Sequence, residues 1–157
     1  MLIVEVAMAF QFFPLYNIDK SVGKGGMNAA DDVKLVQGLL EIVFSDTRSK
    51  AKAERYSKNY QIKIGDVPKP TGVYDQNTEA WIRLFQSYTQ SASQDGKFDP
   101  LRHTGGLEFE VTAGGKQLQL FMLNKTALWV GMTAYMKLGK RLNINHMAKL
   151  DGTLFFY

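Results

Sequence analysis

Two amphipathic segments of this chain can be aligned with each other, and this internal repeat most constrains what the chain can fold into. The segments cover residues 28–44 and 77–88. A shift of 49 positions superposes identical or similar residues, namely Asn28 on Asn77, Val33 on Ile82, Leu35 on Leu84, Val36 on Phe85 and Gln37 on Gln86. A single short repeat predicts two equivalent helices packed about a pseudo-twofold axis, because an open solenoid needs at least three repeats.

The first segment has the start and the apolar stripe of a buried helix. Asn28 is the expected N-cap, and Asp31 and Asp32 suit the positive end of the helix dipole. The apolar residues that recur at helical spacing are Val33, Val36, Leu40 and Val43. Gly38 interrupts this helix at a cost of about 1 kcal/mol relative to Ala, so we expect another segment to approach closely there.

The second segment follows a turn rich in Gly, Pro and polar residues. Its apolar face is formed by Trp81, Leu84, Phe85 and Tyr88, spaced at i, i+3, i+4 and i+7. Asp75 is the expected N-cap, with Asn77 or Thr78 as alternatives. A further turn at residues 95–100 repeats the same kind of sequence after this helix.

The remaining segments predict a small sheet and one more helix. Residues 107–112 alternate apolar and polar side chains as a half-buried strand does, and we expect residues 2–6 and 153–157 to pair with it. Asn124 can cap a helix over residues 127–138. Apolar residues cover more than one face of that helix, which is therefore either deeply buried or partly available to a partner.

The composition and the spacing of reactive residues argue against an enzyme. There is no cysteine, and the two histidines, His103 and His146, lack a metal-ligand spacing. The Gly-rich stretches at residues 23–26 and 114–116 match neither a Walker nor a Rossmann pattern. The paired carboxylates are better explained by a helix dipole at Asp31/Asp32 and a solvent-facing strand at Glu108/Glu110 than by glycosidase chemistry. The sequence thus predicts no catalytic residue, no metal and no cofactor.

The charge and the hydropathy limit the classes of partner. The formal charge is only +4, with basic residues concentrated at positions 48–63 and 137–149, which does not by itself indicate a nucleic-acid binder. No apolar run approaches the roughly 20 residues of a membrane-spanning helix, so we expect no membrane insertion. The apolar N-terminus lacks a basic region and carries Glu5, which is not typical of a conventional signal peptide, and the localisation stays open.

Several of these residues together resemble the peptidoglycan-binding-like domain family. The run Thr71-Gly-Val-Tyr-Asp-Gln-Asn-Thr-Glu-Ala-Trp-Ile-Arg-Leu-Phe-Gln86 is similar to the second half of that domain. Asp32-Val33 and Val36-Gln37-x-x-Leu40 resemble its first half, and Asp95-Gly96-x-Phe98-x-Pro100 its closing loop. The resemblance covers about residues 21–101. It implies a three-helix fold and recognition of cell-wall peptidoglycan, although Asp75 replaces the family's usual Gly and the connection 45–69 is longer and more basic than expected.

These observations predict a mainly α fold in a single domain, residues 1–157. A peptidoglycan-binding-like three-helix core at residues 21–101 would carry extensions at residues 1–20 and 102–157, with an additional C-terminal helix and a small peripheral β-sheet.

The expected function is non-catalytic binding of bacterial peptidoglycan, through either its glycan or its stem peptide. The candidate ligand-binding residues surround the second turn and helix start: Tyr74, Asp75, Asn77, Trp81 and Arg83. Trp81 also fits a core position, and Asp75 and Asn77 also fit capping roles. The alternative function is an adaptor or structural accessory of a secretion or phage-like system that uses the same fold to dock a protein partner. A wall-binding protein without a conventional signal peptide would need a specialised export route, an injection apparatus or lysis to reach the wall. The missing signal peptide and the additional C-terminal helix therefore favour the adaptor.

Overall fold

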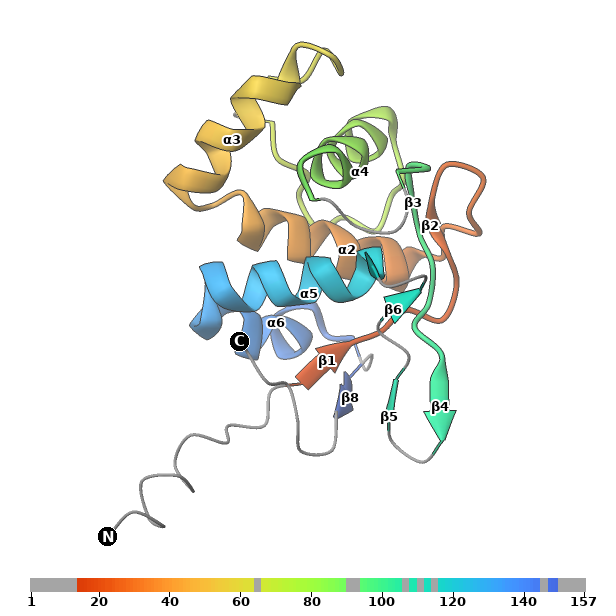
Figure 1. Ribbon diagram of the computed structural model, residues 1–157. Coiled ribbons are helices and arrows are strands. Elements are labelled where there is room, and N and C mark those ends of the chain that lie inside the picture. Colours follow the sequence, from red (N-terminus) through yellow and green to blue (C-terminus); the bar gives the residue numbers. More distant parts are fainter. Residues whose placement is uncertain are drawn as a thin grey trace, which may run out of the picture.

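The computed structural model describes residues 14–63, 66–89, 94–105, 108–109, 112–113, 116–144 and 147–149. These residues form a mainly helical protein with short antiparallel strand pairs, as predicted (Figure 1). The helices are α2 (Ala30–Val43), α3 (Thr47–Ser57), α4 (Gln76–Tyr88), α5 (Gln119–Val130) and α6 (Met132–Leu142).

Helix α2 is the centre of the fold. Helices α5 and α6 pack on one side of it, α4 packs on the other, and α3 packs on α4 (Figure 1). Gly38 is where the C-terminal helices come closest, because a Cβ there would lie 2.9 Å from Cδ1 of both Leu138 and Leu142. The close approach predicted at Gly38 is therefore confirmed.

The short strands tie distant parts of the chain together. β1 (Pro14–Tyr16) pairs with β8 (Met147–Lys149), and β2 (Val22–Gly23) pairs with β3 (Lys97–Phe98). β4 (His103–Gly105) pairs with β5 (Glu108–Phe109), and β6 (Thr112–Ala113) pairs with β7 (Lys116–Gln117).

The predicted strand 107–112 thus contributes to β5 and β6, which belong to two different pairs. The segments expected to pair with it, residues 2–6 and 153–157, lie outside the described residues.

The predicted C-terminal helix 127–138 is in fact two helices. Gly131 separates α5 from α6, and a Cβ there would lie only 3.0 Å from Cγ2 of Ile42 on α2. The prediction that Asn124 caps a helix was wrong, because Asn124 lies inside α5 and its side chain is buried. Its amide bonds to the backbone of Tyr16, which a local sequence pattern does not reveal.

The N-cap predicted for the first helix was also wrong. Ala29 occupies that position in α2 and makes no side-chain capping hydrogen bond. Asn28 instead has φ 51° and holds the preceding turn, accepting from Gly23 N at 2.8 Å and donating to Gly23 O at 3.1 Å. Asp32 is buried and accepts hydrogen bonds from the backbone N–H groups of Asp19 and Lys20, so its role extends beyond the helix dipole.

One hydrophobic cluster extends from Leu15 to Ile144 and includes residues of all five described helices. A polar network crosses it between β1, α5 and α6. Tyr135 Oη donates to Asn124 Oδ1 at 2.6 Å, and Tyr16 Oη donates to the Tyr135 carbonyl at 2.7 Å. Residues outside 21–101 therefore contribute to the same core as those inside it.

Among the described residues, no helix has the length and apolar character needed to cross a bilayer.

Candidate binding cleft

Two glutamines hold the loops on either side of α4. Gln37 accepts a hydrogen bond from Gly72 N at 2.9 Å and donates to Val73 O at 2.9 Å. Gln86 accepts from Gly96 N at 2.7 Å and donates to Lys97 O at 2.9 Å. Both glycines have positive φ, 80° at Gly72 and 77° at Gly96, a conformation that glycine adopts without steric cost. The two loops are thus fixed to the helical core by matching contacts.

The connection 45–69 contains helix α3, which the sequence did not predict. Asp46 is its N-cap and accepts hydrogen bonds from the backbone N–H groups of Arg48 and Ser49, both at 3.1 Å. The buried residues of α3 are small, Ser49, Ala53 and Ser57, and they allow α3 to pack closely on α4. The chain that leaves α3 therefore runs beside the start of α4.

A cleft of about 470 Å³ lies between this returning chain and α4. One wall is formed by residues 60–63 and Asp66, and the other by the first two turns of α4. The lining residues are Tyr60, Gln61, Ile62, Lys63, Asp66, Gln76, Asn77, Glu79, Ala80 and Arg83. The cleft thus combines an aromatic ring, three amides and charged groups of both signs.

Two contacts fix the walls of the cleft to each other. Asn77 Nδ2 donates to the carbonyl of Asp66 at 2.8 Å, which joins the start of α4 to the opposite wall. The hydroxyl of Tyr60 hydrogen-bonds the hydroxyl of Ser87, and Ser87 also donates to the Arg83 carbonyl at 2.9 Å. The cleft is therefore preformed rather than assembled by a ligand.

Charged groups on α4 and the phenol of Tyr74, which precedes this helix, form a network at the edge of the cleft. Tyr74 Oη donates to Glu79 Oε2 at 2.9 Å, and Arg83 pairs with Glu79 Oε1 at 3.0 Å. Burial raises the pKa of Tyr74 above its ordinary 10.0, and the bond to Glu79 raises it further. The same bond lowers the pKa of Glu79, with a contribution from Arg83. The carboxylate is thus held ionised between a neutral phenol and a guanidinium.

The structure separates the five sequence-predicted site residues. Asn77 and Arg83 line the cleft, and Tyr74 lies one hydrogen bond away through Glu79. Asp75 is the N-cap of α4, as predicted, and accepts from Thr78 N at 2.7 Å. Trp81 is fully buried and packs on Phe44 with ring centroids 4.7 Å apart, so it belongs to the core rather than to the cleft.

Sequence reasoning missed the wall formed by residues 60–63 and Asp66. The available signal was the i, i+4 spacing of Tyr56 and Tyr60 at the end of the polar connection, because both tyrosines pack against the hydrophobic core.

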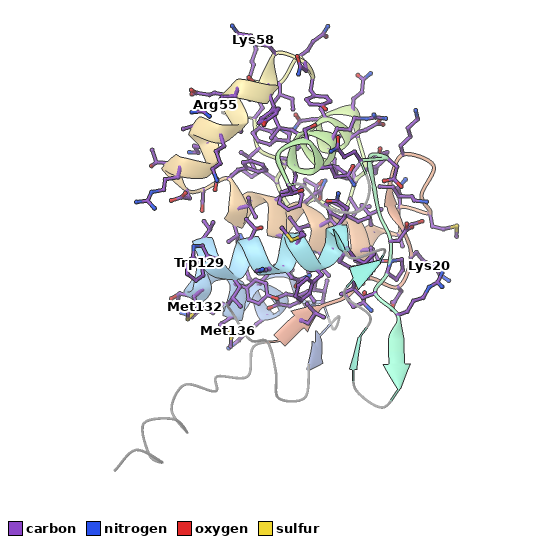
Figure 2. The ribbon with its side chains drawn as sticks, viewed as in Figure 1. Lys20, Arg55, Lys58, Trp129, Met132 and Met136 are labelled. Atoms are coloured by element: carbon purple, nitrogen blue, oxygen red, sulfur yellow. The ribbon has the colours of Figure 1, made fainter. Side chains whose placement is uncertain are left out.

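Two exposed surfaces lie outside the cleft. Five exposed cations lie on α3 and at its C-cap: Arg48, Lys50, Lys52, Arg55 and Lys58. Around the junction of α5 and α6, Trp129, Met132 and Met136 are 79%, 50% and 44% exposed. Figure 2 shows these three side chains at one end of the two helices, away from Arg55 and Lys58.

Among the described residues, no group of three or more His, Asp or Glu side chains could hold a metal ion. The side chains of His103 and His146 lie outside that description. Comparisons with protein-family models, curated proteins and solved structures found no match to this chain.

Proposed function

We propose that this protein is a non-catalytic module that binds bacterial cell-wall peptidoglycan, through its glycan or its stem peptide. The observation that carries the proposal is the preformed cleft between residues 60–66 and α4. Saccharide and peptide ligands need a ring face for packing and a few oriented polar groups. Tyr60 offers the ring face, and the side-chain amides of Gln61, Gln76 and Asn77 offer the polar groups.

The equivalence of the two halves supports the same proposal. Gln37 and Gln86 bind their glycine loops with the same atoms, which fits two copies of one unit as in the peptidoglycan-binding-like family. The ionised Glu79 and the guanidinium of Arg83 add charges of both signs at the cleft edge. Peptidoglycan stem peptides carry free carboxylates as well as amides, so both kinds of group find a counterpart there.

A sedimentation assay with purified, insoluble sacculi tests the proposal. Ala80→Met narrows the cleft with only a small loss of helix propensity, and Ala134→Met makes the same change at an exposed position on α6. We expect salt-resistant sedimentation of the wild type and of Ala134→Met, and at least a tenfold loss for Ala80→Met, roughly 1.4 kcal/mol. Wild-type protein that stays in the supernatant would remove the wall-binding function.

A protein-docking adaptor is the second candidate, and the exposed side chains of Trp129, Met132 and Met136 favour it. Large exposed apolar groups that lie together are typical of interaction sites. The double substitution Trp129→Ser/Met136→Ser separates the two functions. It should leave sedimentation with sacculi unchanged if the cleft carries the function, whereas loss of sedimentation would place the interaction on the α5–α6 face.

A further inference from the structure

The exposed face of α3 is strongly positive. The segment 46–63 carries six Lys or Arg residues against Asp46 and Glu54, a surplus of four that equals the formal charge of +4 for the whole chain. The rest of the chain carries no net charge, although a smaller group of basic residues lies at positions 137–149. The segment beside the cleft therefore holds a positive surplus equal to the net charge of the whole chain.

Four of these cations form a continuous stripe. Arg48, Lys52, Arg55 and Lys58 are all exposed and follow one another at intervals of four, three and three residues, which places them on one helical face. At 1.5 Å per residue the stripe is about 15 Å long. Figure 2 shows Arg55 and Lys58 directed away from the body of the protein.

The stripe is not neutralised within the described part of the chain. The ion pairs there use Glu41, Glu79 and Asp99, and none involves a residue of α3. Glu54 lies one turn after Lys50 and one turn before Lys58, at the edge of the stripe. Like charges at three- and four-residue spacing repel one another weakly, and a bound anion would relieve this repulsion.

The chain runs from α3 into one wall of the cleft. Residues 60–63, which follow α3, form one wall, and Lys63 continues the positive charge into the lining. A ligand held in the cleft can thus present an attached anionic chain to α3. Resting on the proposed function, we infer that the α3 stripe binds a linear phosphodiester polymer attached to the peptidoglycan.

The chemistry of the stripe favours such a polymer over other anions. Guanidinium groups at Arg48 and Arg55 suit phosphate oxygens, which they can bind with two parallel hydrogen bonds. The outward positions beside them are Ala51 and Asn59, with no exposed aromatic ring on which a nucleobase could stack. The exposed face of α3 also offers no large apolar or aromatic side chain of the kind that anchors many protein interfaces.

The test compares two charge-matched variants. Arg55→Gln/Lys58→Gln removes two cations from the stripe, and Lys20→Gln/Lys137→Gln removes two exposed cations elsewhere. Binding is measured to a purified poly(glycerol phosphate) wall polymer, to sacculi that carry it, and to sacculi from which phosphodiesters have been stripped.

We expect the stripe variant to lose at least about tenfold in affinity for the polymer and for polymer-bearing sacculi, with a shallower salt dependence. The control variant should bind as the wild type does, and all three proteins should bind stripped sacculi equally.

Equal polymer binding by the two variants would overturn the inference. Failure of the proposed function has a different result, which is loss of wild-type binding to stripped sacculi.

Discussion

Gln37 and Gln86 make the same pair of hydrogen bonds, each accepting from a glycine N–H and donating to the carbonyl of the next residue. The two glutamines lie 49 positions apart, on α2 and α4. Both are buried, at 1% and 0% exposure, so water cannot replace these bonds. Gln37 on α2 therefore fixes the loop before α4, and Gln86 on α4 fixes the loop after it.

The buried amide of Gln86 should contribute measurably to stability. Gln86→Leu keeps the volume but leaves the N–H of Gly96 and the carbonyl of Lys97 without their partner, which should lower the free energy of unfolding by roughly 2–4 kcal/mol. Urea denaturation measures the change. Gln76→Leu, at an exposed site, should stay within about 0.5 kcal/mol of the wild type. Equal stability of the two variants would show that the hydrogen bonds of Gln86 to Gly96 and Lys97 do not stabilise the fold.

Gly72 should tolerate alanine less well than Gly25. Both have positive φ, so alanine at either position costs about 1–2 kcal/mol. At Gly72 a Cβ would also lie 2.9 Å from the backbone oxygen of Ala30, whereas nothing lies within 4 Å of it at Gly25. Gly72→Ala should therefore cost at least about 1 kcal/mol more than Gly25→Ala in thermal unfolding. A similar cost at both sites would show that α2 yields to the added methyl group.

The bond between Tyr74 and Glu79 should make stability depend on pH in acid. The pKa of Glu79 is lowered in the folded state, so its contribution is present above its ordinary pKa of 4.5 and is lost as the pH falls through the folded value. Tyr74→Phe removes the largest cause of that lowering. Chemical unfolding at pH 7 and pH 3 should show a smaller loss of stability on acidification for the variant.

The same substitution in a Glu79→Gln background provides the control. Without the carboxylate, Tyr74→Phe should leave the acid dependence unchanged. A persistent effect would mean that Tyr74 acts on another titrating group.

Asn124 should be among the most sensitive polar positions of the core. Its side chain accepts from Tyr16 N at 2.9 Å and from Tyr135 Oη at 2.6 Å, and it donates to Tyr16 O at 2.9 Å. Asn124→Leu removes these bonds in a buried setting and should cost roughly 2–5 kcal/mol. Tyr135→Phe removes only one of them and should cost about 1–2 kcal/mol in the same denaturation assay. A larger loss of stability for Tyr135→Phe than for Asn124→Leu would show that Asn124 is not the centre of this hydrogen-bond network.

Local patterns in the sequence determined α2 and α4, the capping role of Asp75 and the close contact at Gly38. They did so because helical periodicity and capping depend on residues three or four positions apart. The repeat that relates Gln37 to Gln86 was also visible in the sequence. The structure explains why glutamine occurs at both positions, because each accepts a hydrogen bond from the glycine of a loop. Trp81 could be placed in either the core or a ligand site, and packing on Phe44 decided for the core.

Only the tertiary structure determined the cleft, α3 and the role of Asn124. Helix α3 buries Ser49, Ala53 and Ser57 rather than an apolar stripe, so hydropathy does not reveal it, yet its packing on α4 brings residues 60–63 to Asn77 and Arg83. Asn124 bonds to Tyr16, 108 positions away. Interactions over such separations leave no local periodicity, because they depend on which surfaces meet after the helices have formed.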